Sequence, residues 1–419
     1  MAALPSIALA YGFLGSNLGD VAITKGALAL LRAAGADGQI KVISRGLNTR
    51  LTRGSWNRVV ASDPDIVFHA WDHTFGPFRS ESPPSIDFVD AMLDSPHVRA
   101  QILNAASLRG VERLYYSGGE NLFSYGTAHD EWNLFGRLSV ILAAQAEGVR
   151  TGFLPCTFGP FESEVSRHLI ARAVEGADFV LARDLRSLEQ LPPAAQASPG
   201  ADCAFFTPDA VSTATPPSRW GKRIALVPRI EGTGLRIGPV RSQTYMATLG
   251  EQGIEQSGAF QLYLSIGRRL LAAGRYIRLL TQCDADVELN RALFNALKPL
   301  AKLENQVNLT RPGNLMAYHR VLASCGGVVT SRLHTAIFAL QNGVVPIALY
   351  YDGHGHKTPG VFEVFGLGEF CMPAQDFTPD MLLPLIAHAR SRAAEARVTI
   401  DAVREQTIQT VSRDGGLAD

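Results

Sequence analysis

The stretch GVVTSRLHTAIFALQNGVVPIALYY, residues 327–351, decides the fold class of this chain. A β-branched apolar run at 326–331 gives way to a helical pattern at 332–342, and a second apolar run follows at 344–351. Strand, helix and strand in this order predict a βαβ unit with parallel strands. Arg332 and His334 stand where the first strand passes into the helix. Two basic side chains are therefore expected at the carboxyl end of a strand.

The same alternation continues along the whole chain. In the first half it predicts strands at 6–12, 39–45, 65–70, 113–119, 150–156, 177–183 and 201–206, with helices at 20–34, 131–147 and 163–175. In the second half it predicts strands at 222–229, 275–282, 305–310, 326–331 and 344–351, with helices around 243–273, 285–299, 314–323 and 332–342 and a last helix over much of 378–412. Several strands are almost continuously apolar, which is typical of parallel sheets buried on both faces.

The length of 419 residues predicts two domains, because a single hydrophobic core stops growing well below this size. Residues 207–220 lose all periodicity and are rich in Pro, Ser and Thr, so they are interpreted as a linker. We therefore expect an N-terminal α/β domain at 1–206, a C-terminal α/β domain at 221–395, and a C-terminal helix and tail at 396–419. Ligands of such open sheets bind beyond the carboxyl ends of the strands.

Composition excludes several functional classes. Lys plus Arg and Asp plus Glu both number 39, so no overall electrostatic field favours nucleic acid. The five cysteines are dispersed without a C-x-x-C pair, which disfavours a disulfide framework or a thiolate zinc site and fits a reducing cytoplasm. No apolar window is long enough to predict a transmembrane helix or a secretion signal. Peripheral membrane association and the oligomeric state stay open.

Glycine-rich strand ends supply the first candidate residues. Gly12, Gly15 and Gly19 follow the first strand, and Asp20 is placed to cap the next helix. The pattern is not G-x-G-x-x-G, and the second strand ends in an arginine, Arg45, rather than an acid, which disfavours NAD. No P-loop is present. A dinucleotide dehydrogenase is therefore a minor alternative, and a P-loop ATPase is excluded.

Two further strand ends carry acidic residues. The SGGEN segment at 117–121 supplies Glu120 and Asn121, and a tight turn with a solvated glutamate is its plain interpretation. Arg183 and Asp184 precede a helix, where a capping aspartate beside a surface arginine explains the pair without catalysis. A functional role for Glu120 is favoured only by its position, because the carboxyl ends of the strands of one sheet converge on the same crevice.

The histidines do not predict a metal site. His69 and His73 straddle a strand-to-loop transition, where a spacing of four does not place side chains on one face. His354 and His356 form a lone H-x-H in a loop without a cysteine or carboxylate nearby in sequence. We therefore expect no metal.

The opening stretch predicts an anion site. With Ser331 as helix cap, Arg332, Leu333 and His334 occupy the first turn, where backbone N–H groups lack partners. The arginine adds a fork of donors suited to phosphate or carboxylate and is expected to contribute little packing. Arg229 ends the first strand after the linker and is expected at the same crevice. A small, multiply charged anion is the predicted ligand, and a surface ion pair of Arg332 is the plain alternative.

Ordered motifs from about residue 10 to 368 resemble the polysaccharide pyruvyl transferase family. The specific motif is S-R-L-H-x-x-I-F-A from Ser331, followed by V-P-x-x-x-x-Y and Lys357. Less specific matches are N-x-G-D at 17–20, G-G-E-N at 118–121, an F-G-P segment expected to form a turn at 158–160, and R-D-x-x-S at 183–187. The H-G-H stretch before Lys357 departs from the pattern, and residues 71–100 do not align with it.

The resemblance implies two Rossmann-like domains facing a central cleft, a glycosyltransferase-B-like fold. It also implies transfer of pyruvate from phosphoenolpyruvate to two hydroxyls of a sugar, in a polysaccharide or glycan precursor, as a cyclic ketal. The family associates Arg332, His334 and an arginine matching Arg229 with phosphoenolpyruvate and places the acceptor sugar in the first domain. The other expected substrate-binding residues are Ser331, Leu333, Lys357, Asn17, Gly19, Gly118, Gly119 and Asn121.

The chemistry of phosphoenolpyruvate agrees with these residues, because its phosphate and carboxylate need two cationic or N–H-rich contacts. His334 is the candidate acid that protonates the methylene carbon, and Asp20 or Glu120 is the candidate base for a sugar hydroxyl. Phosphoenolpyruvate is then a co-substrate, and no cofactor is expected. The acceptor's identity and its possible lipid linkage stay open.

Two alternatives share this fold. A nucleotide-sugar glycosyltransferase would use the arginines to hold a diphosphate, and a non-catalytic carbohydrate-binding relative would keep the fold without the chemistry. The fold does not separate them, because function depends on the site. Binding of phosphoenolpyruvate rather than a nucleotide sugar separates the first two, and turnover excludes the third.

Overall fold

The protein is described here from a computed structural model. The structure describes residues 6–12, 17–44, 65–70, 81–210, 221–230, 249–352 and 356–417. These residues form two compact units. The first comprises Met1–Gly15, Asp20–Thr207 and Val403–Asp419, and the second comprises Ser16–Gly19 and Pro208–Ala402. The chain thus divides at 207/208, where the predicted linker begins, while residues 211–220 of that linker lie outside the described residues.

The first unit contains a parallel sheet with strand order β3-β2-β1-β4-β6-β7-β8, and β5 pairs with β6. This is the order of a Rossmann-like sheet, in which the chain switches direction between β1 and β4. The strands are β1 (Ile7–Ala10), β2 (Ile40–Ser44), β3 (Ile66–Ala70), β4 (Arg113–Tyr116), β5 (Gly119–Ser124), β6 (Arg150–Phe161), β7 (Phe179–Ala182) and β8 (Ser198–Pro199).

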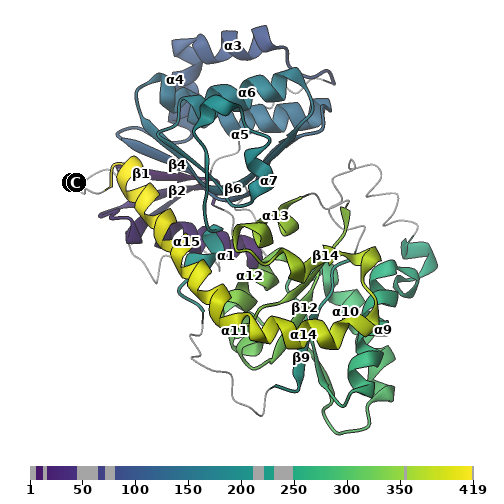
Figure 1. Cartoon of the computed structure of the whole chain (residues 1–419). Helices are drawn as coiled ribbons and strands as arrows, with labels where there is room; N and C mark the ends of the chain where they lie inside the picture. The colour runs from purple at the N-terminus through teal and green to yellow at the C-terminus, as the bar shows by residue number, and fades with distance from the viewer. Residues whose placement is uncertain are drawn as a thin grey trace. The chain divides into compact units, whose positions relative to one another are not determined.

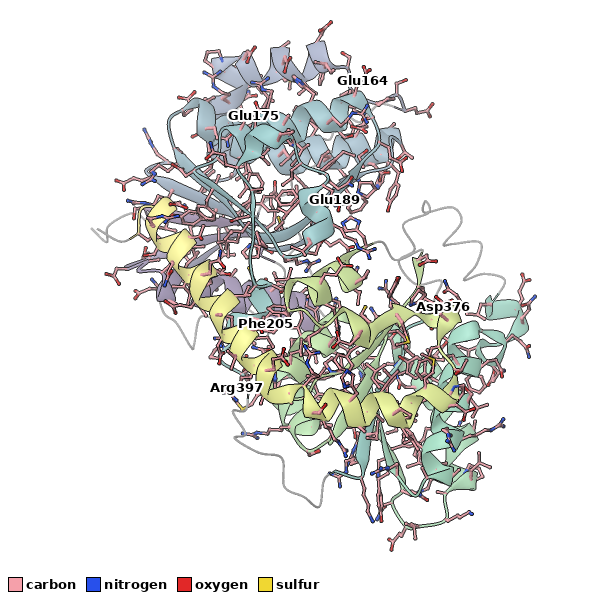
Figure 2. All side chains as sticks on the ribbon, viewed as in Figure 1. Glu164, Glu175, Glu189, Phe205, Asp376 and Arg397 are labelled. Atoms are coloured by element: carbon pink, nitrogen blue, oxygen red, sulfur yellow. The ribbon has the colours of Figure 1, made fainter. Side chains whose placement is uncertain are left out.

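Helices on one face of this sheet enclose the core of the first unit (Figure 1). They are α3 (Ile86–Asp94), α4 (Pro96–Ala105), α5 (Ala128–Ala146) and α6 (Glu164–Glu175), and α1 (Leu18–Ala33) and the short α7 (Leu185–Leu188) complete the unit with the end of α15 (Ala393–Asp414). Local signals fix where these helices begin. Thr127 caps α5, and a capping box of Ser163 and Ser166 opens α6, whose two ends are labelled in Figure 2.

The second unit repeats the same topology. Its parallel sheet has the order β11-β10-β9-β12-β13-β14, with the switch between β9 and β12. The strands are β9 (Arg223–Val227), β10 (Tyr276–Leu280), β11 (Val307–Thr310), β12 (Gly327–Thr330), β13 (Ile347–Tyr350) and β14 (Cys371–Pro373). The helices are α9 (Gly258–Ala272), α10 (Val287–Leu297), α11 (Leu315–Ala323), α12 (Leu333–Gln341), α13 (Lys357–Val364), α14 (Leu382–Ser391) and the start of α15.

Three expectations about local structure are wrong. Residues 201–206 are not a strand: Cys203–Phe206 form a 3-10 helix, which the Asp202 side chain caps by accepting from Ala204 N at 2.7 Å. Its buried Phe205 is labelled in Figure 2. A short apolar run fits a strand or a helical turn equally, and the capping aspartate decides between them. The F-G-P segment at 158–160 lies inside β6 rather than in a turn, and most of the predicted 117–121 turn belongs to β5.

Boundaries differ at two other places. The helix predicted over 243–273 begins as α9 only at Gly258, where Ser257 caps it, and residues 243–248 lie outside the described residues. The expected C-terminal helix over 378–412 is two helices, α14 and α15, separated at Arg392. The end of α15 joins the first unit from Val403 onward. The tail at 396–419 is therefore divided between the two units instead of forming a separate part.

Candidate functional site

The S-R-L-H motif lies at the switch point of the second sheet. Strands β9 and β12 are parallel neighbours, Val227 pairs with Thr330, and Ser331 N donates to Val227 O at 3.0 Å. Arg229 follows the carboxyl end of β9, and Ser331 and Arg332 follow that of β12. The carboxyl ends of the two strands that flank a switch point form the usual ligand crevice of such a sheet. These residues therefore lie at the carboxyl edge of the sheet, where the sequence patterns predicted them.

The start of α12 differs from the prediction by one residue. Ser331 is not the helix cap, because Arg332 occupies that position and no side chain caps the first amides. Ser331 Oγ instead lies 2.9 Å from the hydroxyl of buried Tyr263. Thr330 Oγ1 accepts from Arg332 N at 2.9 Å and so shapes the turn before the helix. Leu333 and His334 open the first turn, which keeps the anion-attracting end of the helix without a side-chain cap.

Arg332 forms a buried ion pair that sequence analysis missed. Its Nε donates to Asp286 Oδ2 at 2.8 Å and its Nη2 donates to Asp286 Oδ1 at 2.6 Å. Arg332 is 9% exposed and Asp286 is 0% exposed. Burial lowers the pKa of Arg332, but the charge and hydrogen bonds of Asp286 outweigh it and hold the pKa above its usual value. The expectation that Arg332 contributes little packing is therefore wrong. The alternative of an ion pair at the surface is also wrong, because the partner of Arg332 is buried.

A chain of hydrogen bonds lies behind this ion pair. Thr335 Oγ1 donates to Gln282 Oε1 at 2.7 Å, and the hydroxyl of Tyr318 lies 2.7 Å from Thr335 Oγ1. Because Thr335 already uses its proton toward Gln282, Tyr318 is the donor in that contact. Burial raises the pKa of Tyr318, which keeps its hydroxyl protonated. Gln282 and Asp286 follow β10, so a third strand end contributes to the site. In the sequence, only the polar segment TQCDAD at 281–286 indicated that this strand end carries functional residues.

Asn17 and Gly19 connect the start of α1 to this network. Asn17 Oδ1 accepts from Gly19 N at 3.0 Å and from Gln282 Nε2 at 3.1 Å. Asn17 thus caps α1, whereas Asp20, the predicted cap, lies within the first turn. A Cβ on Gly19 would lie 2.7 Å from Cγ of His334. Glycine is therefore needed at position 19 because the imidazole of His334 packs directly on it.

Arg229 and Lys357 come from neighbouring strand ends of the same sheet. Arg229 is half-buried two residues after β9. Lys357 is half-buried and opens α13, which follows β13, the other parallel neighbour of β12. Part of the H-G-H stretch, including His354, lies outside the described residues. Both cations follow carboxyl strand ends, as an anion site at this edge requires.

The G-G-E-N residues lie at the switch point of the first sheet. They follow β4, which pairs with β1 so that Ala10 is opposite Tyr116. Gly118 is packed so tightly that a Cβ would lie 2.5 Å from Pro155 O, and Gly119 has a positive φ of 123°. Glu120 is half-buried, and the carbonyl of Asn121 accepts a hydrogen bond from Arg137. Close packing and a left-handed backbone explain both glycines structurally.

Arg183 is not the surface residue that was expected. It is 1% exposed and donates from Nη1 to Asp202 at 2.8 Å and from Nε to Thr157 Oγ1 at 2.9 Å. Burial lowers its pKa, but the negative charges of Asp202, Glu120 and Asp184 raise it above its usual value. Asp184 does cap α7, as predicted. The R-D-x-x-S motif is thus part of the buried interior, and its arginine interacts electrostatically with Glu120.

No group of three metal-ligating side chains occurs among the described residues. His69 Nε2 lies 2.9 Å from Ala105 O, and His73 lies outside the described part of the chain. In that same part, none of the helices has the length and apolarity needed to cross a bilayer.

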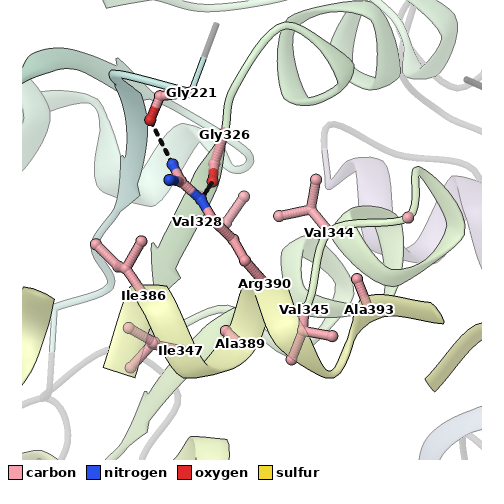
Figure 3. A pocket seen from close by; sticks show the side chains of 12 residues that line it. Gly221, Gly326, Val328, Val344, Val345, Ile347, Ile386, Ala389, Arg390 and Ala393 are labelled. Atoms are coloured by element: carbon pink, nitrogen blue, oxygen red, sulfur yellow. Dashed lines mark hydrogen bonds between the residues drawn. The ribbon is translucent and has the colours of Figure 1, made fainter. Parts of the chain in front are cut away.

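A cavity of about 390 Å³ lies elsewhere in the second unit (Figure 3). Its lining includes Gly326, Gly327 and Val328, at the amino end of β12, and it is largely apolar. Arg390 donates from Nε to Gly326 O at 2.9 Å at its edge. The motif residues follow the carboxyl ends of the strands instead, so this cavity is separate from the candidate site.

Solved structures with a similar fold include UDP-GlcNAc 2-epimerases. That of Neisseria meningitidis, bound to UDP-GlcNAc, has a TM-score of 0.53 at 10% identity, over 97% of this chain and 97% of that one. That of Methanocaldococcus jannaschii has a TM-score of 0.51 at 9% identity, over 96% of this chain and 99% of that one. Such low identity supports only the fold, which is glycosyltransferase-B-like with two Rossmann-like units. A comparison with curated protein sequences finds no match.

The family profile for polysaccharide pyruvyl transferase matches residues 17–353. The match begins at Asn17, which caps α1, and includes the G-G-E-N segment, the buried Arg332–Asp286 pair and the start of α12. It covers most of the chain and confirms the resemblance seen in the sequence motifs. This chain therefore belongs to the polysaccharide pyruvyl transferase family.

Proposed function

We propose that this pyruvyl transferase moves pyruvate from phosphoenolpyruvate onto two hydroxyls of a sugar, in a polysaccharide or glycan precursor, as a cyclic ketal. The observation that carries the proposal is the start of α12. Its first amides have no side-chain cap, and Arg332 stands directly before them at the switch point. Such a helix end attracts phosphate through its N–H groups and its dipole. Arg229 and Lys357, which follow the neighbouring strands, would add positive charge for the trianionic donor.

His334 is the proposed acid. Protonation of the methylene carbon of phosphoenolpyruvate forms the methyl group and leaves an oxocarbenium-like C2. One sugar hydroxyl attacks C2 and loses its proton, and the C2–O bond to phosphate then breaks. The second hydroxyl attacks C2 and closes the ketal. Of the two hydroxyl protons, one replaces the proton that the acid delivered and the other leaves with phosphate. The packing of the His334 imidazole on Gly19 would restrict its orientation for the first step.

The acceptor sugar is proposed to bind through the first unit. Asp20, in the first turn of α1, and Glu120, after β4, are the candidate bases for the attacking hydroxyl. Gly118, Gly119 and Asn121 are the remaining family-motif residues of the first unit. Asn17 and Gly19 belong to the second unit with Ser331 and Leu333, which flank Arg332 on the donor side. No cofactor enters the scheme, and a cytoplasmic location, where the donor is available, is part of the proposal.

Titration calorimetry with phosphoenolpyruvate and, separately, with UDP-GlcNAc tests the donor. Heat of binding with phosphoenolpyruvate alone is the expected result. Binding of the nucleotide sugar alone would indicate a glycosyltransferase instead. Turnover in deuterated water then tests the chemistry, because the methyl group of the ketal should carry one solvent deuterium. A labelled methyl group is not expected from glycosyl transfer, in which no carbon is protonated.

A further inference from the structure

We propose that Asp286 is a positioning residue that holds Arg332 so that the Nη1 end of its guanidinium is offered to the donor. This inference rests on the proposed function. It changes the expected role of Arg332 from a fork that turns freely toward an anion to a guanidinium held in one orientation. Two of the three guanidinium nitrogens already bind the same carboxylate, at 2.8 and 2.6 Å. The Nε–Nη2 edge of the guanidinium is therefore occupied, which leaves the N–H groups at its Nη1 end for a ligand.

The side chain of Asp286 binds Arg332 and does not cap the helix that follows it. It precedes α10, a place where aspartate normally caps the helix, yet its side chain makes no capping hydrogen bond. Both carboxylate oxygens face Arg332 instead, and the residue is fully buried. Burial raises the pKa of Tyr263 and of Tyr318, and the negative charge of Asp286 raises both further. The two hydrogen bonds to Asp286 fix the orientation of the guanidinium.

The remaining nitrogen, Nη1, is the part of Arg332 that stays available. Within the part of the chain that the structure describes, it makes no hydrogen bond, and it is not among the buried polar atoms that lack a partner. The small exposed fraction of Arg332 is consistent with a nitrogen at the edge of the site. Arg332 and Asp286 together carry no net charge. Binding of the trianionic donor would therefore depend for charge on Arg229, Lys357 and the amides of α12.

A competing arrangement is an exchange, in which Arg332 leaves Asp286 and clasps the donor with its fork. Exchange would strand a carboxylate that is 0% exposed without its cation. Breaking a buried ion pair by removing one partner is strongly unfavourable, because the other charge stays desolvated. The burial of Asp286 therefore favours a pair that persists when the donor binds.

The substitution Asp286→Asn separates the two arrangements, because they predict effects of opposite sign. If Asp286 positions Arg332, the variant should bind phosphoenolpyruvate about tenfold more weakly, since the neutral amide holds the guanidinium less firmly, a change of about 1.4 kcal/mol. If Asp286 competes with the donor, the same variant should bind more tightly. Asp286→Glu keeps the charge and should recover part of the affinity.

Affinity is measured by calorimetry on the full chain, with the melting temperature recorded in parallel. The matched control is Asp202→Asn, which weakens the other buried arginine–aspartate pair, Arg183–Asp202. The control should lower the melting temperature without changing donor affinity. An Asp286→Asn protein that melts lower yet binds the donor as the parent does would show that Asp286 is only structural and would overturn the proposal. So would tighter binding.

Arg332→Lys gives a second readout if Asp286→Asn does not fold. Lysine keeps the charge but not the planar guanidinium, so affinity should again fall about tenfold under the proposal. Affinity equal to the parent's would mean that charge alone matters and would overturn it. Failure of the parent protein to bind phosphoenolpyruvate would refute the proposed function and this inference together. Binding by the parent with no change in the variants would refute the inference alone.

Discussion

The two units each bury an arginine–aspartate pair, and the pairs serve different ends. Arg183 and Asp202 are each 1% exposed, and Arg183 also donates to Thr157. Arg332 and Asp286 are buried as well, but Arg332 keeps an exposed edge and stands before the uncapped start of α12. An enclosed pair can only support the fold. A pair with one nitrogen at the edge of a strand-end site can also serve a ligand.

The largest effect is expected at His334, on the same helix start as Arg332. His334→Gln keeps a polar side chain of similar length but loses the capacity to deliver a proton. Turnover should fall roughly 10²- to 10⁴-fold, the usual contribution of a general acid, while donor affinity changes little. Steady-state kinetics and calorimetry measure the two quantities separately. Turnover near the parent rate would remove His334 from the acid role and direct attention to Lys357.

Arg332→Ala should reduce both donor binding and stability. It leaves Asp286 buried without its cation, so the free energy of unfolding should fall by about 3–5 kcal/mol. Phosphoenolpyruvate binding should be lost with the Nη1 donor. Urea unfolding and calorimetry measure these two effects.

Arg183→Ala is the comparison variant for that prediction, because it removes the cation of the other buried arginine–aspartate pair. It should lose comparable stability, and its folded fraction should keep its donor affinity. Equal loss of donor affinity in both variants would contradict the difference drawn between the two pairs.

Gly19→Ala should have an intermediate effect that arises from packing alone. The added Cβ would lie 2.7 Å from Cγ of His334, so the imidazole or the start of α1 must shift. A stability loss of roughly 1–3 kcal/mol is expected from such overpacking, with reduced turnover. Gly368→Ala is the matched control, because a Cβ at Gly368 has no atom within 4 Å. Equal turnover in both variants would show that His334 tolerates displacement.

The smallest effect is expected from metal removal. Arginines and helix amides can neutralise a phosphate without an ion, so dialysis against a chelator should leave turnover unchanged. The measurement is turnover before and after dialysis, with each divalent ion added back separately. Activity that is lost and then restored by one particular metal would contradict this expectation.

Sequence patterns predicted most of the architecture. Apolar periodicity is a local property, and it predicted all but three of the described strands near their observed bounds, the exceptions being β5, β8 and β14. It failed at 201–206, where a four-residue apolar run forms a 3-10 helix capped by Asp202. The S-R-L-H motif was predicted at a strand end because strand, turn and helix follow directly in the chain.

The sequence by itself determined the fold class, the family and the place of Arg332 and His334 at the start of a helix. Only the tertiary structure decided what these residues contact. Asp286 is 46 positions before Arg332 in the chain. The two meet because β10 and β12 flank β9 in the sheet, so that residues following both strands emerge at the same edge. Strand order depends on packing across the whole sheet, and no local pattern of residues encodes it.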